Sequence, residues 1–77
     1  MKTPRNLSAQ DLIKILSKYG YQVTRQKGSH IRLIRSSDKG EHAVTVPNHD
    51  PLKIGTLSAI INDVTSYLEI DKENFFK

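Results

Sequence analysis

The spacing of apolar residues changes at Gly20, and this change limits the folds open to the chain. Before Gly20, apolar side chains recur every three to four residues, as on one face of a helix: Leu12, Ile13, Leu16 and Tyr19. After Gly20, Tyr21 and Val23 alternate with polar residues, which is the period of a strand. The sequence therefore predicts a helix that leads directly into a β-sheet, because each period suits only one kind of element.

Both ends of the predicted helix carry capping residues. The Ser8 hydroxyl can accept a hydrogen bond from the amide of Asp11, while the Asp11 carboxylate can accept one from the amide of Ser8, as in a capping box. Gly20 can adopt the left-handed conformation that commonly closes a helix. We therefore expect a helix over about residues 9–19.

Three strands joined by short turns are predicted for residues 21–47. Gly28 and Ser29 form the first turn, and the polar segment 36–40 forms the second. Pro47 ends the third strand because proline has no N–H to donate to a sheet. Connections this short favour an antiparallel meander.

Alternation within the strands predicts which side chains face the core. Tyr21 and Val23 are expected on the half-buried face of the first strand, which ends near Lys27. In the third strand, Val44 and Val46 are expected to point inward. Ala43 and Thr45, which alternate with them, are expected to point outward.

A second helix is predicted over roughly residues 54–63, with apolar side chains at helical spacing: Leu52, Leu57, Ile60, Ile61 and Val64. Residues 65–66 are expected to interrupt this helix. Asp71 is expected to cap a last short turn, whose Phe75 and Phe76 fold back on the core.

The order helix, three strands, helix predicts an α+β fold in which both helices pack on one face of a three-stranded antiparallel sheet. With 77 residues, the chain is expected to form one domain over 1–77, with a flexible arm over 1–6 and a C-terminal extension over 65–77. The other sheet face is then open to a ligand. A domain this small buries only about 60% of its unfolded surface, so we expect a shallow site for a polymer.

The composition of the chain excludes several kinds of site and favours one cellular location. Cysteine is absent, which excludes disulfides and thiolate sites and favours a reducing cytoplasm. No apolar run approaches the roughly 18–20 residues of a membrane span, and the polar residues 1–6 predict no secretory signal. His30, His42 and His49 lack the spacing of a metal site, so neither a metal nor a cofactor is expected. We interpret His42 as structural or a secondary RNA contact, and His49 as solvated.

Charge points to an anionic partner. The chain carries 12 Lys and Arg residues against 8 Asp and Glu residues, a net charge of +4. Every charged residue from 14 to 35 is basic, namely Lys14, Lys18, Arg25, Lys27, Arg32 and Arg35. Such a segment is typical of a phosphate-binding face, although on charge alone an ordinary solvated surface explains it equally well.

His30 is the candidate catalytic residue. If Ile31 and Leu33 face the helices, His30 and Arg32 share the open face of the sheet. RNA scission needs one proton removed from a ribose 2′-OH and another given to the leaving 5′-oxygen, and an imidazole can perform either transfer. Basic neighbours could hold the phosphate and offset its developing charge, namely Arg25, Lys27 and Arg32. On spacing alone, a lone histidine in a strand is more often a surface polar residue or one held by a hydrogen bond than a catalytic group.

Three blocks of the sequence resemble the HicA toxin family. Residues 20–30 match the segment G-[FYW]-x-x-x-R-x-x-G-S-H that follows the first helix in that family. Residues 46–49 match its V-P-x-H element, and residues 53–60 match K-x-G-T-L-x-x-I. The likeness spans about residues 7–76, and the ordered set of blocks is far more specific than G-S-H alone.

The resemblance implies a fold like that of double-stranded-RNA-binding domains. It also implies metal-independent mRNA cleavage that requires His30, and a HicB antitoxin that covers the active surface. Gly28, Ser29 and Lys53 are further candidate RNA contacts, because a glycine lets a backbone approach RNA closely and a lysine before a helix can meet a phosphate.

Two departures from the family pattern leave His30 untouched. The family usually has a bulky aromatic residue where this chain has Leu33 or Ile34, and residues 1–6 are a longer arm than is common.

Two other functions stay open from the sequence. A noncatalytic RNA-binding module of similar fold would use the same basic face, but it would not need His30. A DNA-binding accessory is less favoured, because neither predicted helix presents an evident basic recognition face. Incubation of labelled single-stranded RNA with the chain in EDTA separates the nuclease from the binding module.

Overall fold

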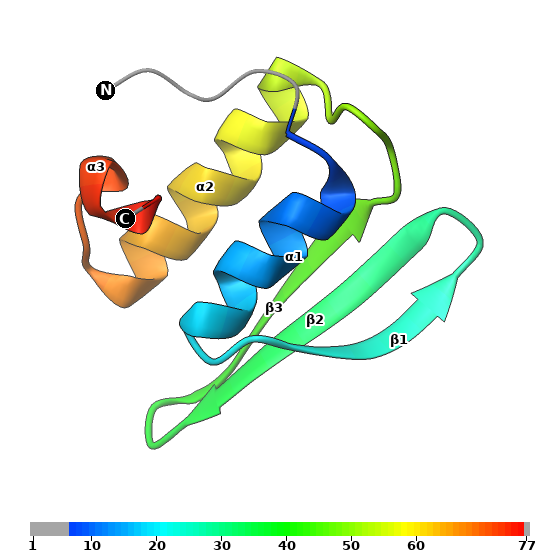
Figure 1. Cartoon of the computed structure of the whole chain (residues 1–77). Helices are drawn as coiled ribbons and strands as arrows, with labels where there is room; N and C mark the ends of the chain where they lie inside the picture. The colour runs from blue at the N-terminus through cyan, green and yellow to red at the C-terminus, as the bar shows by residue number, and fades with distance from the viewer. Residues whose placement is uncertain (1–6, 77) are drawn as a thin grey trace.

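The computed structural model describes residues 7–76, so the predicted arm over 1–6 lies outside the described residues. The elements follow the predicted order (Figure 1): α1 (Ala9–Lys18), β1 (Gln22–Lys27), β2 (His30–Ser37), β3 (Gly40–Pro47), α2 (Ile54–Leu68) and the short α3 (Lys72–Phe75). The three strands pair antiparallel in the order β1-β2-β3, so β2 is central. Figure 1 shows α1 and α2 on the same side of this sheet, which confirms the predicted α+β architecture.

The predicted ends of α1 are confirmed. Ser8 Oγ accepts from the amide of Asp11 at 3.1 Å, and the Ser8 amide donates to the Asp11 carboxylate at 3.2 Å. At the other end Gly20 has a φ of 92°, and the amides of Gly20 and Tyr21 donate to the carbonyls of Ser17 and Leu16. This pair of bonds is the Schellman motif, which satisfies carbonyls that the helix leaves free.

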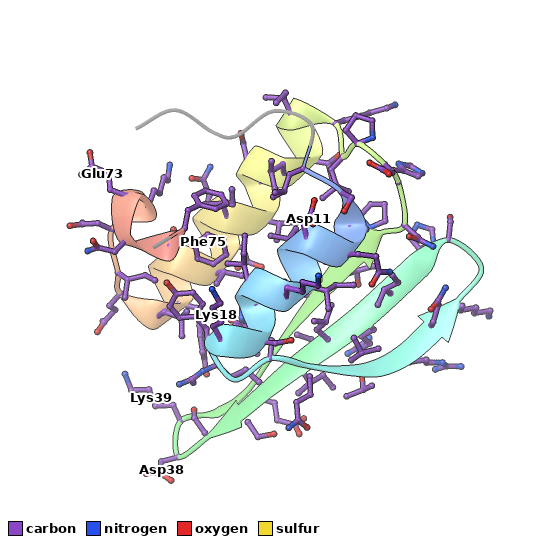
Figure 2. All side chains as sticks on the ribbon, in the orientation of Figure 1. Asp11, Lys18, Asp38, Lys39, Glu73 and Phe75 are labelled. Carbon is purple, nitrogen blue, oxygen red and sulfur yellow. The ribbon has the colours of Figure 1, made fainter. Side chains whose placement is uncertain are left out.

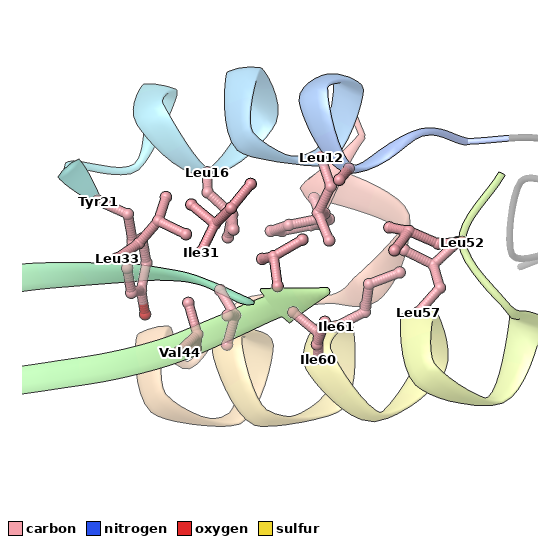
Figure 3. Close-up of a cluster of buried hydrophobic side chains, with 14 residues drawn as sticks. Leu12, Leu16, Tyr21, Ile31, Leu33, Val44, Leu52, Leu57, Ile60 and Ile61 are labelled. Carbon is pink, nitrogen blue, oxygen red and sulfur yellow. The ribbon is translucent and has the colours of Figure 1, made fainter. Parts of the chain in front are cut away.

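The core lies between the helices and the sheet (Figure 3). The side chains with at most 2% exposure come from every layer, including Leu12 and Leu16 of α1, Ile31 and Leu33 of β2, Val46 of β3, Leu57, Ile61 and Val64 of α2, and Tyr21 and Phe75. The inward prediction for Val44 and Val46 is confirmed, since they are 5% and 0% exposed. Burial of so many aliphatic side chains is the main favourable term in the folding of a small domain.

The prediction of a half-buried first strand is wrong for Val23. Every residue of β1 is exposed, and Val23 is 51% exposed. β1 is an edge strand, and its pairing with β2 shifts register between Val23 and Arg25. A bulge of this kind bends and twists a strand, and an edge strand has a neighbour on one side only, so the apolar alternation did not bring Val23 under the helices.

The predicted interruption of the second helix at residues 65–66 is wrong. α2 continues through them to Leu68 and ends at Glu69, whose φ is 58°. The buried Thr65 hydroxyl donates to the carbonyl of Ile61 at 2.7 Å, one turn earlier in the helix. A threonine that meets its hydrogen-bonding need in this way can stay within a helix.

The C-terminal segment folds back on the core, as predicted. Phe75 is 1% exposed and stacks on Tyr19 with ring centroids 5.3 Å apart. The Tyr19 hydroxyl donates to the carbonyls of Asn74 and Phe75. Asp71 occupies the predicted N-cap position of α3, but only its carbonyl, and not its side chain, accepts a bond from the first turn.

His42 ties the sheet to α2 on the covered face. Its Nε2 lies 3.2 Å from Asp63 Oδ1, its Nδ1 lies 2.6 Å from the Tyr21 hydroxyl, and its ring stacks on Tyr67. Because the Asp63 carboxylate can only accept, Nε2 carries the hydrogen in this contact, and Nδ1 can then accept from the Tyr21 hydroxyl. The structural interpretation of His42 agrees with this position.

Replacement of Tyr21 by phenylalanine is expected to flatten the loss of stability at alkaline pH. Burial raises the pKa of Tyr21 from 10.0 to about 12, and the charge of Asp63 adds to the shift while that of Arg35 opposes it. The unfolded chain therefore loses this proton first, so the stabilising contribution is complete below pH 10 and falls as the pH rises to 12. Urea unfolding of both chains across this range measures the difference, and parallel curves would contradict it.

Candidate active site

His30 is the first residue of β2 and directly follows the Gly28-Ser29 turn. Gly28 has a φ of 58°, which glycine adopts at little cost, and Lys27 pairs with His30 across the turn. The Ser29 carbonyl accepts from the amide of Asn48 at 2.6 Å, so the turn is tied to the segment after β3. The backbone on both sides of His30 is therefore held in place.

The His30 side chain points away from the core. Its neighbour Ile31 is 2% exposed and Leu33 is 0% exposed on the helix side of β2, so His30 and Arg32 lie on the opposite, open face. Both are exposed. An imidazole in this position can be reached by a polymer lying on the sheet.

Strand register brings basic side chains from β1 and β2 together on the open face. Lys27 pairs with His30, and Arg25 pairs with Arg32. Arg32 in turn pairs with Thr45 of β3. These five side chains line a shallow depression of about 200 Å³, which we call the basic depression. It joins one imidazole, three cations and one hydroxyl.

The cations of the basic depression are not paired with any carboxylate of residues 7–76. Within residues 7–76, the side chains of Arg25, Lys27 and Arg32 form no ion pair and no hydrogen bond. Two arginines directly opposite each other on a sheet repel, which destabilises the pair. A bound phosphate would relieve this repulsion and could accept hydrogen bonds from both guanidinium groups.

The remaining candidate residues lie at the edge of the depression or beyond it. Gly28 and Ser29 form the turn beside it, but Lys53 does not line it. Lys53 is instead the exposed N-cap residue of α2. Thr45 also lines the depression, although it was not among the predicted site residues. Its predicted outward position in the third strand is the signal that could have identified it.

The described part of the chain shows neither a metal-binding group of side chains nor a membrane-spanning helix. No group of three or more His, Asp or Glu side chains within residues 7–76 is arranged to hold a metal ion. None of the helices in this range combines the length and the apolar character needed to cross a membrane.

A comparison with protein families shows to which family this chain is related. Residues 9–65 match the family model of the HicA toxin of bacterial toxin–antitoxin systems, which is well over half of the chain. The chain belongs to the HicA toxin family. Neither the comparison with curated proteins nor that with solved structures found a match.

The matched span of this HicA-family chain contains the complete basic depression. Arg25, Lys27, His30, Arg32 and Thr45 all fall within residues 9–65. Members of the family are typically RNases, and a toxin of such a system generally has an antitoxin partner. The segment that carries Phe75 follows the matched span.

Proposed function

We propose that this chain is a metal-independent mRNA endoribonuclease in which His30 moves a proton at the scissile phosphodiester. The observation that carries the proposal is the position of His30 on the open sheet face, in one depression with Arg25, Lys27 and Arg32. A proton-transfer group beside several cations is what scission of a phosphodiester requires.

The reaction follows from the chemistry of RNA. The ribose 2′-oxygen loses its proton and attacks the neighbouring phosphorus, the bond to the 5′-oxygen breaks, and that oxygen takes up a proton. The products are a 2′,3′-cyclic phosphate and a 5′-hydroxyl. The exposed His30 imidazole can remove the first proton or supply the second. DNA lacks the 2′-OH and is therefore spared.

The basic side chains hold the phosphate during this reaction. Arg25 and Arg32 face each other across the strands and can donate to the same phosphate, and Lys27 adds a charge beside His30. The positive charges of these three side chains also stabilise the negative charge that develops on the phosphate in the transition state. We assign Gly28 and Ser29 to the RNA backbone beside the turn, and Lys53 to a phosphate farther along the message.

We further propose that the chain acts in the cytoplasm and is inhibited by a HicB-type antitoxin that covers the basic depression. Cations that pair with no carboxylate in the described part of the chain would favour an acidic antitoxin surface and speed its association. A protein bound there would also exclude RNA from His30.

Purified chain is expected to cut labelled single-stranded RNA in EDTA and to leave 2′,3′-cyclic phosphate ends. Mass spectrometry of the products identifies these ends. Binding of RNA without cleavage would favour a noncatalytic RNA-binding module, and a requirement for added metal would contradict the proposed mechanism.

Charge reversal at Arg32 is expected to weaken RNA cleavage and antitoxin binding together. Arg32→Glu replaces a side chain that can donate hydrogen bonds to a phosphate with one whose charge repels it. The cleavage rate and the antitoxin affinity should therefore each fall by at least about tenfold. Lys39→Glu is the matched control, because it makes the same change at an exposed turn outside the basic depression. Cleavage rates and titration calorimetry measure the two effects, and unchanged antitoxin affinity would show that the surfaces are separate.

A further inference from the structure

The open face continues past the basic depression into an uncharged row of side chains. Gln22 pairs with Ile34, and Ile34 pairs with Ala43, so these three residues lie side by side across β1, β2 and β3. We call them the neutral row. Along β2 and β3 it lies two residues from Arg32 and Thr45, which corresponds to about 7 Å.

The charge of the face changes sign beyond the neutral row. The next paired positions are Ser36 and Glu41, and the hairpin turn that follows carries Asp38 and Lys39 (Figure 2). The two carboxylates of Asp38 and Glu41 outnumber the one ammonium group of Lys39, so this end attracts phosphate groups less than the basic end does. An RNA backbone held at Arg25 and Arg32 would therefore cross the strands at the basic end and not run along them.

We propose that the neutral row is a platform for the nucleobase next to the phosphate held at Arg25 and Arg32, in a single-stranded RNA. This inference rests on the proposed function, because it places a second part of the same substrate. A base has an apolar face and a polar edge. Ile34 and Ala43 offer an apolar surface, and the Gln22 amide offers a donor and an acceptor beside it.

The side chains of the row indicate which RNA would bind. The bases of a duplex are already stacked and paired, so only an unpaired strand can lay a base on this sheet. All the aromatic side chains of the chain lie elsewhere, in the core or against α2 and α3: Tyr19, Tyr21, Tyr67, Phe75 and Phe76. An aliphatic platform contacts the face of any base, so little sequence preference is expected at this nucleotide.

Removal of the bases from a short RNA tests the proposal. We would compare a uridine tetranucleotide with an abasic tetranucleotide of the same charge, using the His30→Ala chain so that neither is cut. Loss of base stacking is expected to weaken binding about fivefold, near the low end for one base on a protein platform. Equal affinity for the two ligands would overturn the proposal, because phosphate contacts alone would then explain binding.

Methyl resonances locate the contact. The ring current of a base is expected to shift the Ile34 and Ala43 methyl signals when uridine tetranucleotide is added, but not when the abasic ligand is added. Ala43→Phe should tighten binding of the base-bearing ligand severalfold, since an aromatic ring stacks better than a methyl group. Gln26→Phe is the matched control, because Gln26 pairs with buried Ile31 and so lies on the other face of β1. Base-dependent shifts confined to residues outside the neutral row would place the base elsewhere and overturn the proposal.

Cleavage of long RNA, measured separately, distinguishes this proposal from the proposed function. If the wild-type chain cuts no RNA but the neutral-row methyl signals respond to the bases, the nuclease proposal fails and the platform stands. If the chain cuts RNA and the methyl signals do not respond, the platform is wrong and the nuclease stands. Absence of any RNA binding overturns both.

Discussion

His30→Ala is expected to lower the rate of RNA cleavage by roughly 10²–10⁴-fold, the contribution of a general acid or base. RNA binding should change little, because the cations that hold the phosphate remain in place, namely Arg25, Lys27 and Arg32. The fold should also be preserved. His30 is exposed, and its side chain makes no hydrogen bond within residues 7–76. Single-turnover cleavage of labelled RNA in EDTA, with affinity measured in parallel, separates the chemical step from binding.

His49→Ala is the control for this experiment. His49 is also exposed, but it lies in the segment after β3 and outside the basic depression, so its variant should cut RNA like the wild-type chain. A His30→Ala chain that cuts RNA as fast as the wild-type chain would show that the imidazole moves no proton. A parallel loss of binding and cleavage would instead assign His30 to RNA contact.

Phe75→Ala is expected to cost about 3–5 kcal/mol of the free energy of unfolding, as for other large aromatic side chains removed from a core. Phe75 is 1% exposed, stacks on Tyr19 and meets Phe76 edge to face at 5.0 Å. Figure 2 shows its ring directed from α3 toward the helices. Because whole domains are stable by only about 5–15 kcal/mol, a large fraction of the Phe75→Ala molecules should be unfolded at moderate temperature.

Phe76→Ala provides the matched comparison for Phe75. Phe76 is the adjacent residue and is only partly buried, so its loss should destabilise the chain much less. Urea unfolding of both variants gives the two free energies. Equal, small effects would mean that the segment after the family match does not support the core.

The sequence predicted the features that depend on residues close together in the chain. The ends of α1 follow from Ser8, Asp11 and Gly20, because a capping box and a left-handed glycine act within one turn of the helix. The open position of His30 likewise follows from the alternation with Ile31. The three family motifs predicted the HicA family for a similar reason, since each is a continuous block.

Local reasoning failed where another part of the chain determined the outcome. Val23 alternates like a core residue, yet the bulge and the edge position of β1 leave it exposed. Thr65 is a poor helix former, yet its burial within the core keeps it in α2. For Thr65, tertiary packing outweighed a helix preference of less than about 1 kcal/mol.

The sequence alone therefore determined the order of the elements and the residue types available to a site, but the tertiary structure decided which side chains meet. Arg25 faces Arg32, and Arg32 faces Thr45, only because of the register of two strand pairs. Lys53, another candidate from the sequence, stands at the N-cap position of α2 and does not line the basic depression. Caps and periodicity depend on neighbours within a turn of chain, whereas register depends on turn geometry and on the burial of a whole sheet face. A shift of one residue in register would move every side chain of a strand to the other face.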